Sequence, residues 1–169
     1  MAKQIFEGKR IVVLERDDWE YVERKKATEA VAVIAVTEDD EVILTEQDRK
    51  PLNARVIDWP AGLVGDDGEN DPAATAKKEL EEEAGFVCER VELLARGPSS
   101  PGITSEIVSL YRAYGASRVG KGGGIGNEKI TVHLVPLANV ERWLRERERE
   151  GILIDLKLWG GLRFLATSA

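Results

Sequence analysis

The N-terminal third of the chain shows strand patterns separated by polar turns. Residues 30–36, AVAVIAV, form an unbroken apolar run, which predicts a strand buried on both faces. Residues 10–23, RIVVLERDDWEYVE, predict a hairpin that turns at Asp17 and Asp18. VILTEQ, residues 42–47, predicts a further strand, and we expect it to pair with residues 30–36.

The middle of the chain carries one helix with recognisable start and end signals. It follows a stretch rich in Pro, Gly and Asp, residues 49–71, in which loops should dominate. Asp71 is a good N-cap, Pro72 suits the first helical position, and Gly85 suits the C-terminal cap. The sequence therefore predicts a helix between Asp71 and Gly85.

Strand and helix patterns continue to the end of the chain. Strand patterns cover 87–97, 106–115 and 129–137, and helical patterns cover 139–150 and the segment from Asp155 onward. Residues 120–126 contain five glycines in seven positions, so we expect a mobile loop there. Strands on both sides of a central helix indicate a mixed α/β fold.

The central helix ends in a run of carboxylates. Glu79, Glu82 and Glu83 stand at i, i+3 and i+4, so one helical face should present all three, with Glu81 in solvent. Without a counter-ion, like charges at these spacings each cost roughly 0.2–0.5 kcal/mol, and the helix dipole disfavours them near a C-terminus. A solvated acidic face is one explanation, but a hard divalent cation would turn this repulsion into binding.

Composition and charge exclude several other kinds of site. The net charge of −7 argues against nucleic-acid binding, because neutralising phosphates requires a basic surface. Cys88 is the single cysteine, which excludes an internal disulfide, and His133 is the single histidine, which excludes a site built on two imidazoles. No segment resembles a signal peptide or a membrane span, so we expect a cytoplasmic protein without membrane contacts.

Residues 78–86, KELEEEAGF, resemble the second half of the Nudix box, whose pattern is Arg-Glu-apolar-x-Glu-Glu-x-Gly-apolar. Lys78 stands in place of the Arg. The first half of the box has a different spacing, because six residues separate Gly62 from Glu69 where the family has five. Eight residues then precede Lys78 where the family has seven, so the loop carries two extra residues.

Three further segments are similar to Nudix enzymes that cleave ADP-ribose and nucleotide sugars. The sequence EQDRKP…DWPAG, 46–62, resembles their EQxR…ELPAG lead-in. Trp59 stands where these enzymes have an aliphatic residue, and we expect this replacement to alter the substrate pocket. SSPGITSE, 99–106, resembles their SPGxTxE loop, with a proline fifteen residues after the box. GNEKITVHLVPL, 126–137, resembles the segment that carries a catalytic-loop glutamate, and the similarity runs in order over roughly residues 10–160.

The resemblance implies both a fold and an activity. The fold is α/β, a Nudix α/β/α sandwich with a central mixed sheet, preceded by a short N-terminal antiparallel strand pair. Residues 1–28 would form that strand pair, available for dimerisation by strand exchange, and residues 29–169 the hydrolase domain. The activity is Mg²⁺-dependent hydrolysis, with Mn²⁺ as a substitute, of a nucleoside diphosphate linked to a sugar such as ADP-ribose. The expected partners are this small-molecule substrate and a second copy of the chain.

The family's metal-binding roles fall on the box helix and the strand before it. By similarity, Glu79 and Glu83 would be the principal metal ligands. Glu82 would lie beside them with a catalytic part, and the carbonyl of Ala61 would complete the inner shell. In the family, the metal polarises the diphosphate and activates a water molecule.

Three further roles are carried over by similarity to residues outside the box. Glu128, in the glycine-rich loop, would act as the general base or as a final metal ligand. Arg49 would bind a substrate phosphate, and Glu106 would bind the ribose or a metal-bound water.

Competing interpretations differ in how well they fit the sequence. GASRVGKG, 115–122, fits the start of a P-loop, but Gly122 replaces the required hydroxyl residue and no helix pattern follows. A non-catalytic nucleotide-binding Nudix module is a second alternative, although such modules typically lose box glutamates that this chain keeps. Among substrates, GDP-mannose, other nucleotide sugars, dinucleotides and nucleoside triphosphates remain alternatives to ADP-ribose.

Overall fold

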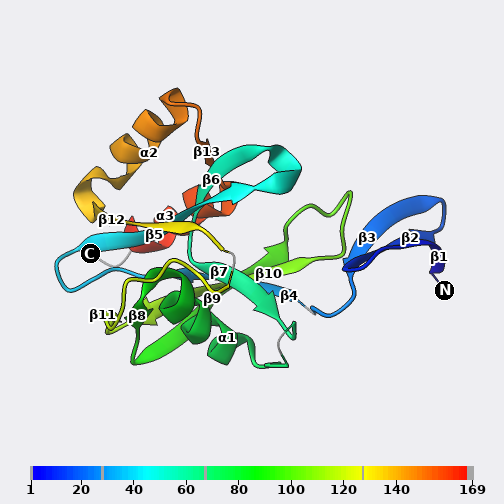
Figure 1. Ribbon diagram of the computed structural model, residues 1–169, viewed down its shortest axis with the longest axis horizontal. Helices are drawn as coiled ribbons and strands as arrows, with labels where there is room; N and C mark the ends of the chain where they lie inside the picture. Colours follow the sequence, from blue (N-terminus) through cyan, green and yellow to red (C-terminus); the bar gives the residue numbers. More distant parts are fainter. Residues whose placement is uncertain (1, 28, 67, 127, 167–169) are drawn as a thin grey trace.

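The computed structural model describes residues 2–27, 29–66, 68–126 and 128–166. A three-stranded arm formed by the N-terminus projects from a larger α/β body (Figure 1). No helix among the described residues is long and apolar enough to cross a membrane.

The elements follow the order expected from the sequence. The strands are β1 (Lys3–Glu7), β2 (Ile11–Arg16), β3 (Trp19–Arg24), β4 (Glu29–Ile34), β5 (Glu41–Arg49), β6 (Ala54–Asp58), β7 (Ala61–Val64), β8 (Phe86–Val87), β9 (Arg90–Pro98), β10 (Ile107–Tyr114), β11 (Ser117–Arg118), β12 (Ile130–Pro136) and β13 (Leu153–Ile154). The helical segments are α1 (Pro72–Glu79), η2 (Leu80–Ala84), α2 (Val140–Arg149) and α3 (Leu156–Ala166), with short 3-10 turns η1 (Lys50–Leu52) and η3 (Leu137–Asn139). The central helix and the two terminal helices are thus confirmed.

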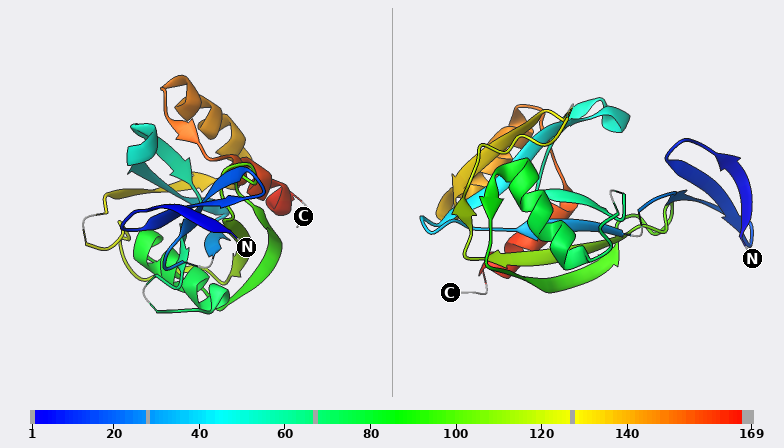
Figure 2. Two further views of the ribbon diagram at one scale, coloured as in Figure 1. Left: turned by 90° about the vertical axis from the view of Figure 1, so that its right-hand side faces the viewer. Right: turned by 60° about the horizontal axis from the view of Figure 1, so that its bottom comes forward.

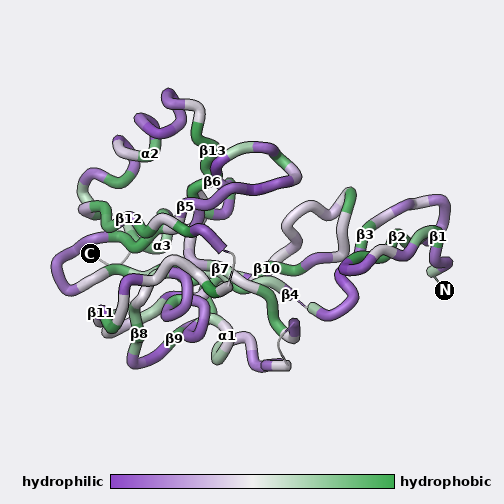
Figure 3. The backbone as a smooth tube through the Cα atoms, in the orientation of Figure 1, coloured by the Kyte–Doolittle hydropathy of each residue, from purple (hydrophilic) through white to green (hydrophobic). Residues whose placement is uncertain are grey.

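Strand β4 lies at the centre of the body, and both of its faces are buried. The side chains of residues 31–35 are fully inaccessible to solvent, as the apolar run predicts. One face packs against α1 and η2, and the other against α2 and α3. The hydrophobic stretches therefore follow the inner strands, whereas the outer helix α2 is largely hydrophilic (Figure 3). This arrangement confirms the predicted α/β/α layering.

The described strands of the body form two four-stranded sheets of mixed direction and a small antiparallel sheet of β8 and β11. The orders of the four-stranded sheets are β7-β4-β10-β9 and β12-β5-β6-β13. The pairs β4–β10 and β6–β13 are parallel, and the other pairs within these sheets are antiparallel.

The predicted pairing of residues 42–47 with residues 30–36 is wrong. Strand β5 pairs with β6 and β12, and it touches the chain that follows β4 only through a bridge between Val36 and Val42 and a hydrogen bond from the Ile43 N–H to the Ala35 carbonyl. Both edges of β5 are therefore already occupied, while its two faces bury apolar side chains in the two core clusters.

The arm is a three-stranded antiparallel sheet in the order β1-β2-β3, so the expected strand pair is extended by one strand. The turn between β2 and β3 lies at Asp17 and Asp18, which both adopt positive φ angles, 50° and 63°. Two successive left-handed residues fit the twist of a tight hairpin, and the predicted turn is confirmed.

The loop between β9 and β10 holds the arm against the body (Figure 2). The Val22 N–H donates to the Ile103 carbonyl at 2.9 Å, and the Trp19 indole N–H donates to the Gly102 carbonyl at 3.2 Å. This loop is the SSPGITSE segment, so the structure joins the arm to one of the motifs singled out in the sequence.

Candidate active site

The box helix begins as the sequence predicts. The Asp71 side chain accepts a hydrogen bond from the Ala73 N–H at 3.0 Å, and Pro72 occupies the first turn. Glu69, at the end of the lengthened loop, accepts from the Asp71 N–H at 2.8 Å, which places it at the start of the helix, away from the carboxylate run. Asp67, in the same loop, lies outside the described residues.

The last turn of the helix has π geometry. From Leu80 to Ala84 the chain is a π-helical turn, and Gly85 ends it in the left-handed conformation with φ 76°. The Gly85 N–H reaches the carbonyls of both Glu81 and Leu80. Such turns occur frequently at functional sites, and they change the angular spacing of the side chains that they carry.

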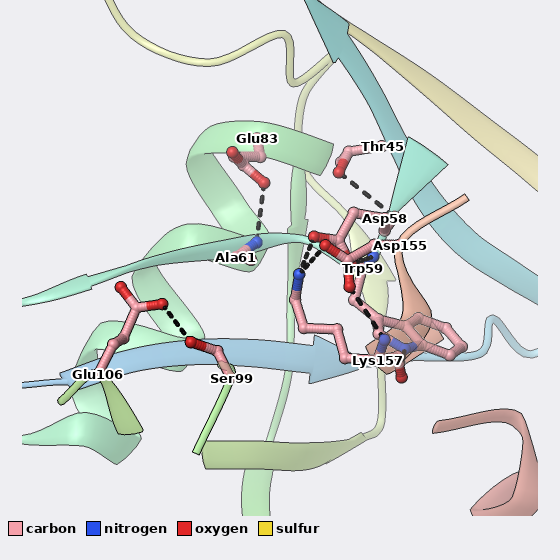
Figure 4. A network of polar contacts seen from close by, with 9 residues as sticks. All are labelled: Thr45, Asp58, Trp59, Ala61, Glu83, Ser99, Glu106, Asp155 and Lys157. Carbon is pink, nitrogen blue, oxygen red and sulfur yellow. Dashed lines mark hydrogen bonds and ion pairs between the residues drawn. The ribbon is translucent and has the colours of Figure 1, made fainter. Parts of the chain in front are cut away.

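Glu83 is the most buried of the box carboxylates, with 4% of its surface exposed. Its carboxylate accepts a hydrogen bond from the Ala61 N–H at 2.9 Å (Figure 4). Burial raises the pKa of Glu83 to about 8; the Ala61 hydrogen bond and the charge of Arg49 act in the opposite direction. Glu79 and Glu128 add to the rise, so these charged groups all act on the Glu83 carboxylate.

Glu79 lies against the same strand, one residue further along. A Cβ atom at Gly62 would overlap the Glu79 carboxylate, so the absence of a side chain at Gly62 makes room for it. Burial and the neighbouring charge of Glu82 raise the pKa of Glu79 to about 7. Asp66 also contributes to this rise. Asp66 was not identified from the sequence, because it is one of several acidic residues in a loop and no motif marks it.

Glu82 lies near both Lys78 and Glu79. It is half-buried, and its carboxylate lies 3.6 Å from the Lys78 ammonium, while Glu81 is exposed as predicted. Glu79 and Glu83 contact β7. The charge of Glu82 raises the pKa of Glu79, so Glu82 lies beside Glu79.

The glycine-rich loop packs on the C-terminal end of the helix. The N–H groups of Gly123 and Gly124 donate to the carbonyls of Glu83 and Glu82 at 2.8 and 3.0 Å. These bonds satisfy carbonyls that a helix end otherwise leaves unpaired. Gly122 contacts the backbone at Glu83 so closely that a Cβ atom would not fit. The loop expected to be mobile is therefore held by backbone hydrogen bonds, and the next element that the structure describes after it is strand β12.

Glu128 lies in this loop, close enough for its charge to raise the pKa values of Glu79 and Glu83. Its carboxylate accepts a hydrogen bond from the Ile125 N–H at 3.0 Å. The structure thus brings a predicted catalytic-loop glutamate, forty-five residues after Glu83 in the sequence, to the box helix.

The structure places Arg49 and Glu106 in different surroundings. Arg49 ends β5, and its charge lowers the pKa of Glu83, which locates it at the carboxylate pair. Glu106 instead forms an ion pair with Arg24 of the arm at 2.7 Å and accepts from the Ser99 hydroxyl at 3.0 Å (Figure 4).

Glu106 helps to line a cleft of about 300 Å³ between arm and body. The lining residues are Glu23, Arg24, Ala27, Glu29, Thr104, Ser105 and Glu106. None of the box glutamates lines this cleft, so the role predicted for Glu106 stays a prediction.

Trp59 does not contact the carboxylate site directly, and its expected effect on the substrate pocket stays a prediction. Its side chain is fully buried, and a Cβ atom at Gly161 of α3 would collide with the indole ring. The indole N–H donates to the Lys157 carbonyl at 3.3 Å. The aromatic ring therefore fills the core beneath α3.

The residues around Ala61 fit a hard divalent cation. Among the described residues, no three Asp, Glu, His or Cys side chains converge into a complete cation site. Mg²⁺ in phosphate-processing sites is nevertheless held by one or two carboxylates together with water and substrate oxygens. Glu79 and Glu83 form such a pair, and a bound cation would offset the high pKa values that burial and neighbouring carboxylates impose on them.

The family model described as NUDIX domain matches residues 26–153 of the chain. The methanol dehydrogenase activator of Bacillus methanolicus is 39% identical over 143 residues, which cover 80% of this chain and 75% of that protein. The ADP-ribose pyrophosphatase of Bacillus subtilis (strain 168) is 37% identical over 118 residues, 66% of this chain and 62% of that protein. A crystal structure described as ADP compounds hydrolase shares the fold, with a TM-score of 0.66, 21% identity, and coverage of 86% of this chain and 80% of that chain.

Proposed function

The chain belongs to the Nudix family and is a pyrophosphohydrolase of that family, and we propose that it cleaves the diphosphate bond of a nucleoside diphosphate linked to a sugar. ADP-ribose is the substrate that the relatives and the sequence motifs favour. The products would be a nucleoside monophosphate and a sugar phosphate. The reaction would depend on Mg²⁺, with Mn²⁺ as a substitute.

One observation carries this proposal, namely the convergence of charged groups at the start of β7. Glu83 is hydrogen-bonded to Ala61, and Glu79 lies against the adjacent Gly62. Arg49 and Glu128, from segments distant in the sequence, act electrostatically on the same carboxylates. A solvated acidic face would not bury Glu83 to 4% exposure, so a binding role accounts for this arrangement better.

Each group at this site has a chemical part in the proposed reaction. Glu79, Glu83 and the Ala61 carbonyl would hold the divalent cation, which would polarise the diphosphate and activate the attacking water. Arg49, as a permanent cation beside an acidic pair, would bind a phosphate oxygen of the substrate. Glu82, half-buried on the same turn, would accept a hydrogen bond from the water that attacks phosphorus and so help to orient it.

Glu128 is suited to accept the proton released by the attacking water. It lies on the loop that packs against the end of the helix, and its charge reaches both Glu79 and Glu83. Its carboxylate accepts a hydrogen bond from Ile125, and it would exchange that bond for one to the water when substrate is present.

The proposal is tested by hydrolysis of a substrate panel in the presence of Mg²⁺. The panel contains ADP-ribose, GDP-mannose, a dinucleoside diphosphate and a nucleoside triphosphate, with products identified by chromatography. We expect the highest kcat/KM for ADP-ribose or a related nucleotide sugar, with a nucleoside monophosphate among the products. Cleavage of none of the diphosphates would contradict the proposal, and preference for the triphosphate would reassign the substrate class.

A second candidate function follows from the relative named methanol dehydrogenase activator, which is 39% identical over an alignment that covers 80% of this chain. We propose as an alternative that this chain activates a dehydrogenase. Addition of the purified chain to methanol dehydrogenase tests it directly. Activation by wild type but not by Glu83→Gln would tie the effect to the hydrolase site, and activation by both would indicate a docking role.

A further inference from the structure

We propose that Lys157, on α3, is a positioning residue for the carboxylate site, acting through Asp58 and the turn that leads to Ala61. The inference rests on the proposed function of that site and extends it to a residue that touches neither cation nor substrate. Figure 4 shows the polar contacts that connect Lys157 to Asp58 and Trp59, which precede the strand that carries Ala61.

The ammonium group of Lys157 lies between two carboxylates. It forms an ion pair with Asp58, at the end of β6, and another with Asp155 at 2.8 Å. The Asp58 side chain is 3% exposed, so Lys157 is the cation that neutralises a buried carboxylate. Burial lowers the pKa of Lys157, but the two carboxylates outweigh this effect and raise the pKa overall.

Asp58 connects Lys157 to the turn before Ala61. Its second carboxylate oxygen accepts from the Trp59 N–H at 2.8 Å, and the Trp59 indole donates to the Lys157 carbonyl. The Pro60 carbonyl accepts from the Val33 N–H of β4 at 2.8 Å. Every residue from Asp58 to Pro60 is therefore anchored, either to α3 or to the central strand.

The anchored turn determines where the next residue directs its N–H group. Ala61 donates to Glu83 at 2.9 Å, and Gly62 beside it accommodates Glu79. Functional groups must be held to within about 0.5 Å of their working geometry by the residues behind them. A shift of the turn would move both the hydrogen-bond donor of Glu83 and the surface on which Glu79 lies.

Stability alone is a weak reason for this ion pair. Replacing a buried ion pair by apolar residues of similar volume is often neutral or stabilising, whereas removing one partner is costly. The Asp58–Lys157 ion pair contacts the turn that leads to Ala61. We infer that its second role is to fix the orientation of Ala61. Lys157 lies 99 residues after Asp58, so no local sequence pattern connects the two.

The test compares Lys157→Met with three matched variants of the full chain. Lys157→Arg keeps the charge, Asp155→Asn removes the partner that does not lead to Ala61, and Arg163→Met removes an exposed cation from the same helix. Hydrogen exchange of the Ala61 amide is compared with that of the β10 amides, and the Mn²⁺ affinity of the metal-free protein is measured by electron paramagnetic resonance.

We expect Lys157→Met to accelerate Ala61 exchange about tenfold more than β10 exchange and to weaken Mn²⁺ binding about tenfold, as is typical for residues that support metal ligands from behind. On the preferred substrate, kcat should fall more than KM rises. Arg163→Met should stay within about twofold of wild type. Asp155→Asn should lose less than Lys157→Met, because Lys157 keeps its ion pair with Asp58, and Lys157→Arg should recover most of the loss.

The double variant Asp58→Asn/Lys157→Met separates positioning from folding. It contains no buried unpaired charge, and the amide oxygen that replaces the Asp58 carboxylate can still accept the Trp59 N–H. The Trp59 indole can also still donate to the backbone carbonyl of residue 157, so only the side-chain contact between residues 58 and 157 is lost. We expect this double variant to fold, and we expect its Ala61 amide to exchange faster and its Mn²⁺ affinity to be lower than in wild type. Wild-type exchange and affinity in this variant, or a uniform acceleration of all amides in Lys157→Met, would overturn the proposal. The exchange and Mn²⁺ readouts do not depend on which substrate is cleaved, so failure of the proposed function is recognised separately by the substrate panel.

Discussion

At the scale of single residues, the site depends on a glycine as much as on its carboxylates. Gly62 leaves the space that the Glu79 carboxylate occupies, and the adjacent Ala61 supplies the hydrogen bond to Glu83. The φ angle of Gly62 is not in the left-handed region, so its role is steric. The site can therefore be disturbed without introducing backbone strain.

Gly62→Ala should lower activity without lowering stability. The added methyl group would displace the Glu79 carboxylate, and disturbing the support of a metal ligand typically costs about 10–100-fold in activity. Alanine has less conformational freedom than glycine in the unfolded chain. The free energy of unfolding should therefore stay unchanged or rise by about 0.4–1 kcal/mol. Steady-state kinetics and urea unfolding measure the two effects. Gly97→Ala, where no atom lies near the added methyl group, is the control; it should leave activity unchanged and have the same small effect on the free energy of unfolding.

Glu128→Gln should lower kcat more than it weakens substrate binding. The amide keeps the size of the side chain and can still accept from the Ile125 N–H, but it cannot take up a proton. General-base catalysis contributes about 10²–10⁴-fold, so a loss in kcat of that order is expected, with a much smaller change in KM. An unchanged kcat would assign the base to another residue. The exposed Glu81→Gln serves as the control.

Much of the site could be predicted from residue types and spacing. The motifs identified Glu79, Glu83, Glu128 and Arg49, and the structure places the other three charges close enough to act on Glu83. Lys157 could not be identified in the same way, because its role depends on packing between segments 99 residues apart. Residue spacing encodes local chemistry, whereas the support of a site depends on tertiary contacts.

At the scale of elements, the ends of the box helix follow from local signals but its last turn does not. Asp71 and Gly85 cap the helix where the sequence predicts. The π turn coincides with hydrogen bonds from Gly123 and Gly124, about forty residues later, to the carbonyls at its end. Contacts from so distant a loop are absent from helix propensity and capping rules, so the sequence could not indicate the turn.

The connection between β6 and α3 should make the stability of Lys157→Met depend on pH. Burial raises the pKa of Asp58 from its ordinary 3.8 to about 6 even with Lys157 present, and removing the cation should raise it further. The folded variant then binds the Asp58 proton more tightly than the unfolded chain does. Its stability is greatest below the unfolded pKa and is lost as the pH rises through the folded pKa.

We therefore expect Lys157→Met to lose about 3–5 kcal/mol of unfolding free energy relative to wild type at pH 8, and clearly less at pH 5. Urea unfolding followed by tryptophan fluorescence at both pH values measures the difference. Arg163→Met should show no such dependence. An equal deficit of Lys157→Met at both pH values would contradict the presence of an unpaired Asp58 carboxylate.

At the scale of the whole molecule, the arm has more exposed apolar surface than a small isolated sheet should carry. All five residues of β1 are exposed, and Phe6 and Trp19 are 57% and 60% exposed. A three-stranded sheet with no covering layer has little core of its own, and β1 leaves an unpaired edge. We propose that a second copy of the chain covers the arm, which gives a homodimer.

Sedimentation equilibrium tests this proposal. Wild type should have about twice the chain mass, because oligomers of soluble proteins are most often twofold dimers. Phe6→Glu should shift the equilibrium towards monomer by placing a charge in the covered surface. The control is Leu156→Glu, at an exposed apolar position on the body that is 84% accessible. A monomeric wild type, or a dimer that Phe6→Glu leaves intact, would contradict the arm as the interface.

The central claim is that Glu83 acts as a cation ligand in diphosphate hydrolysis, and it is tested most directly by Mg²⁺-dependent hydrolysis of the preferred substrate. Wild type is compared with Glu83→Gln and with Glu81→Gln, which lies on the same turn but is exposed. Cation assistance is worth several kcal/mol, and each 1.4 kcal/mol is about tenfold in rate, so Glu83→Gln should be at least about 100-fold slower. Glu81→Gln should remain within about twofold of wild type. Full activity of Glu83→Gln, or an equal loss in both variants, would contradict the claim.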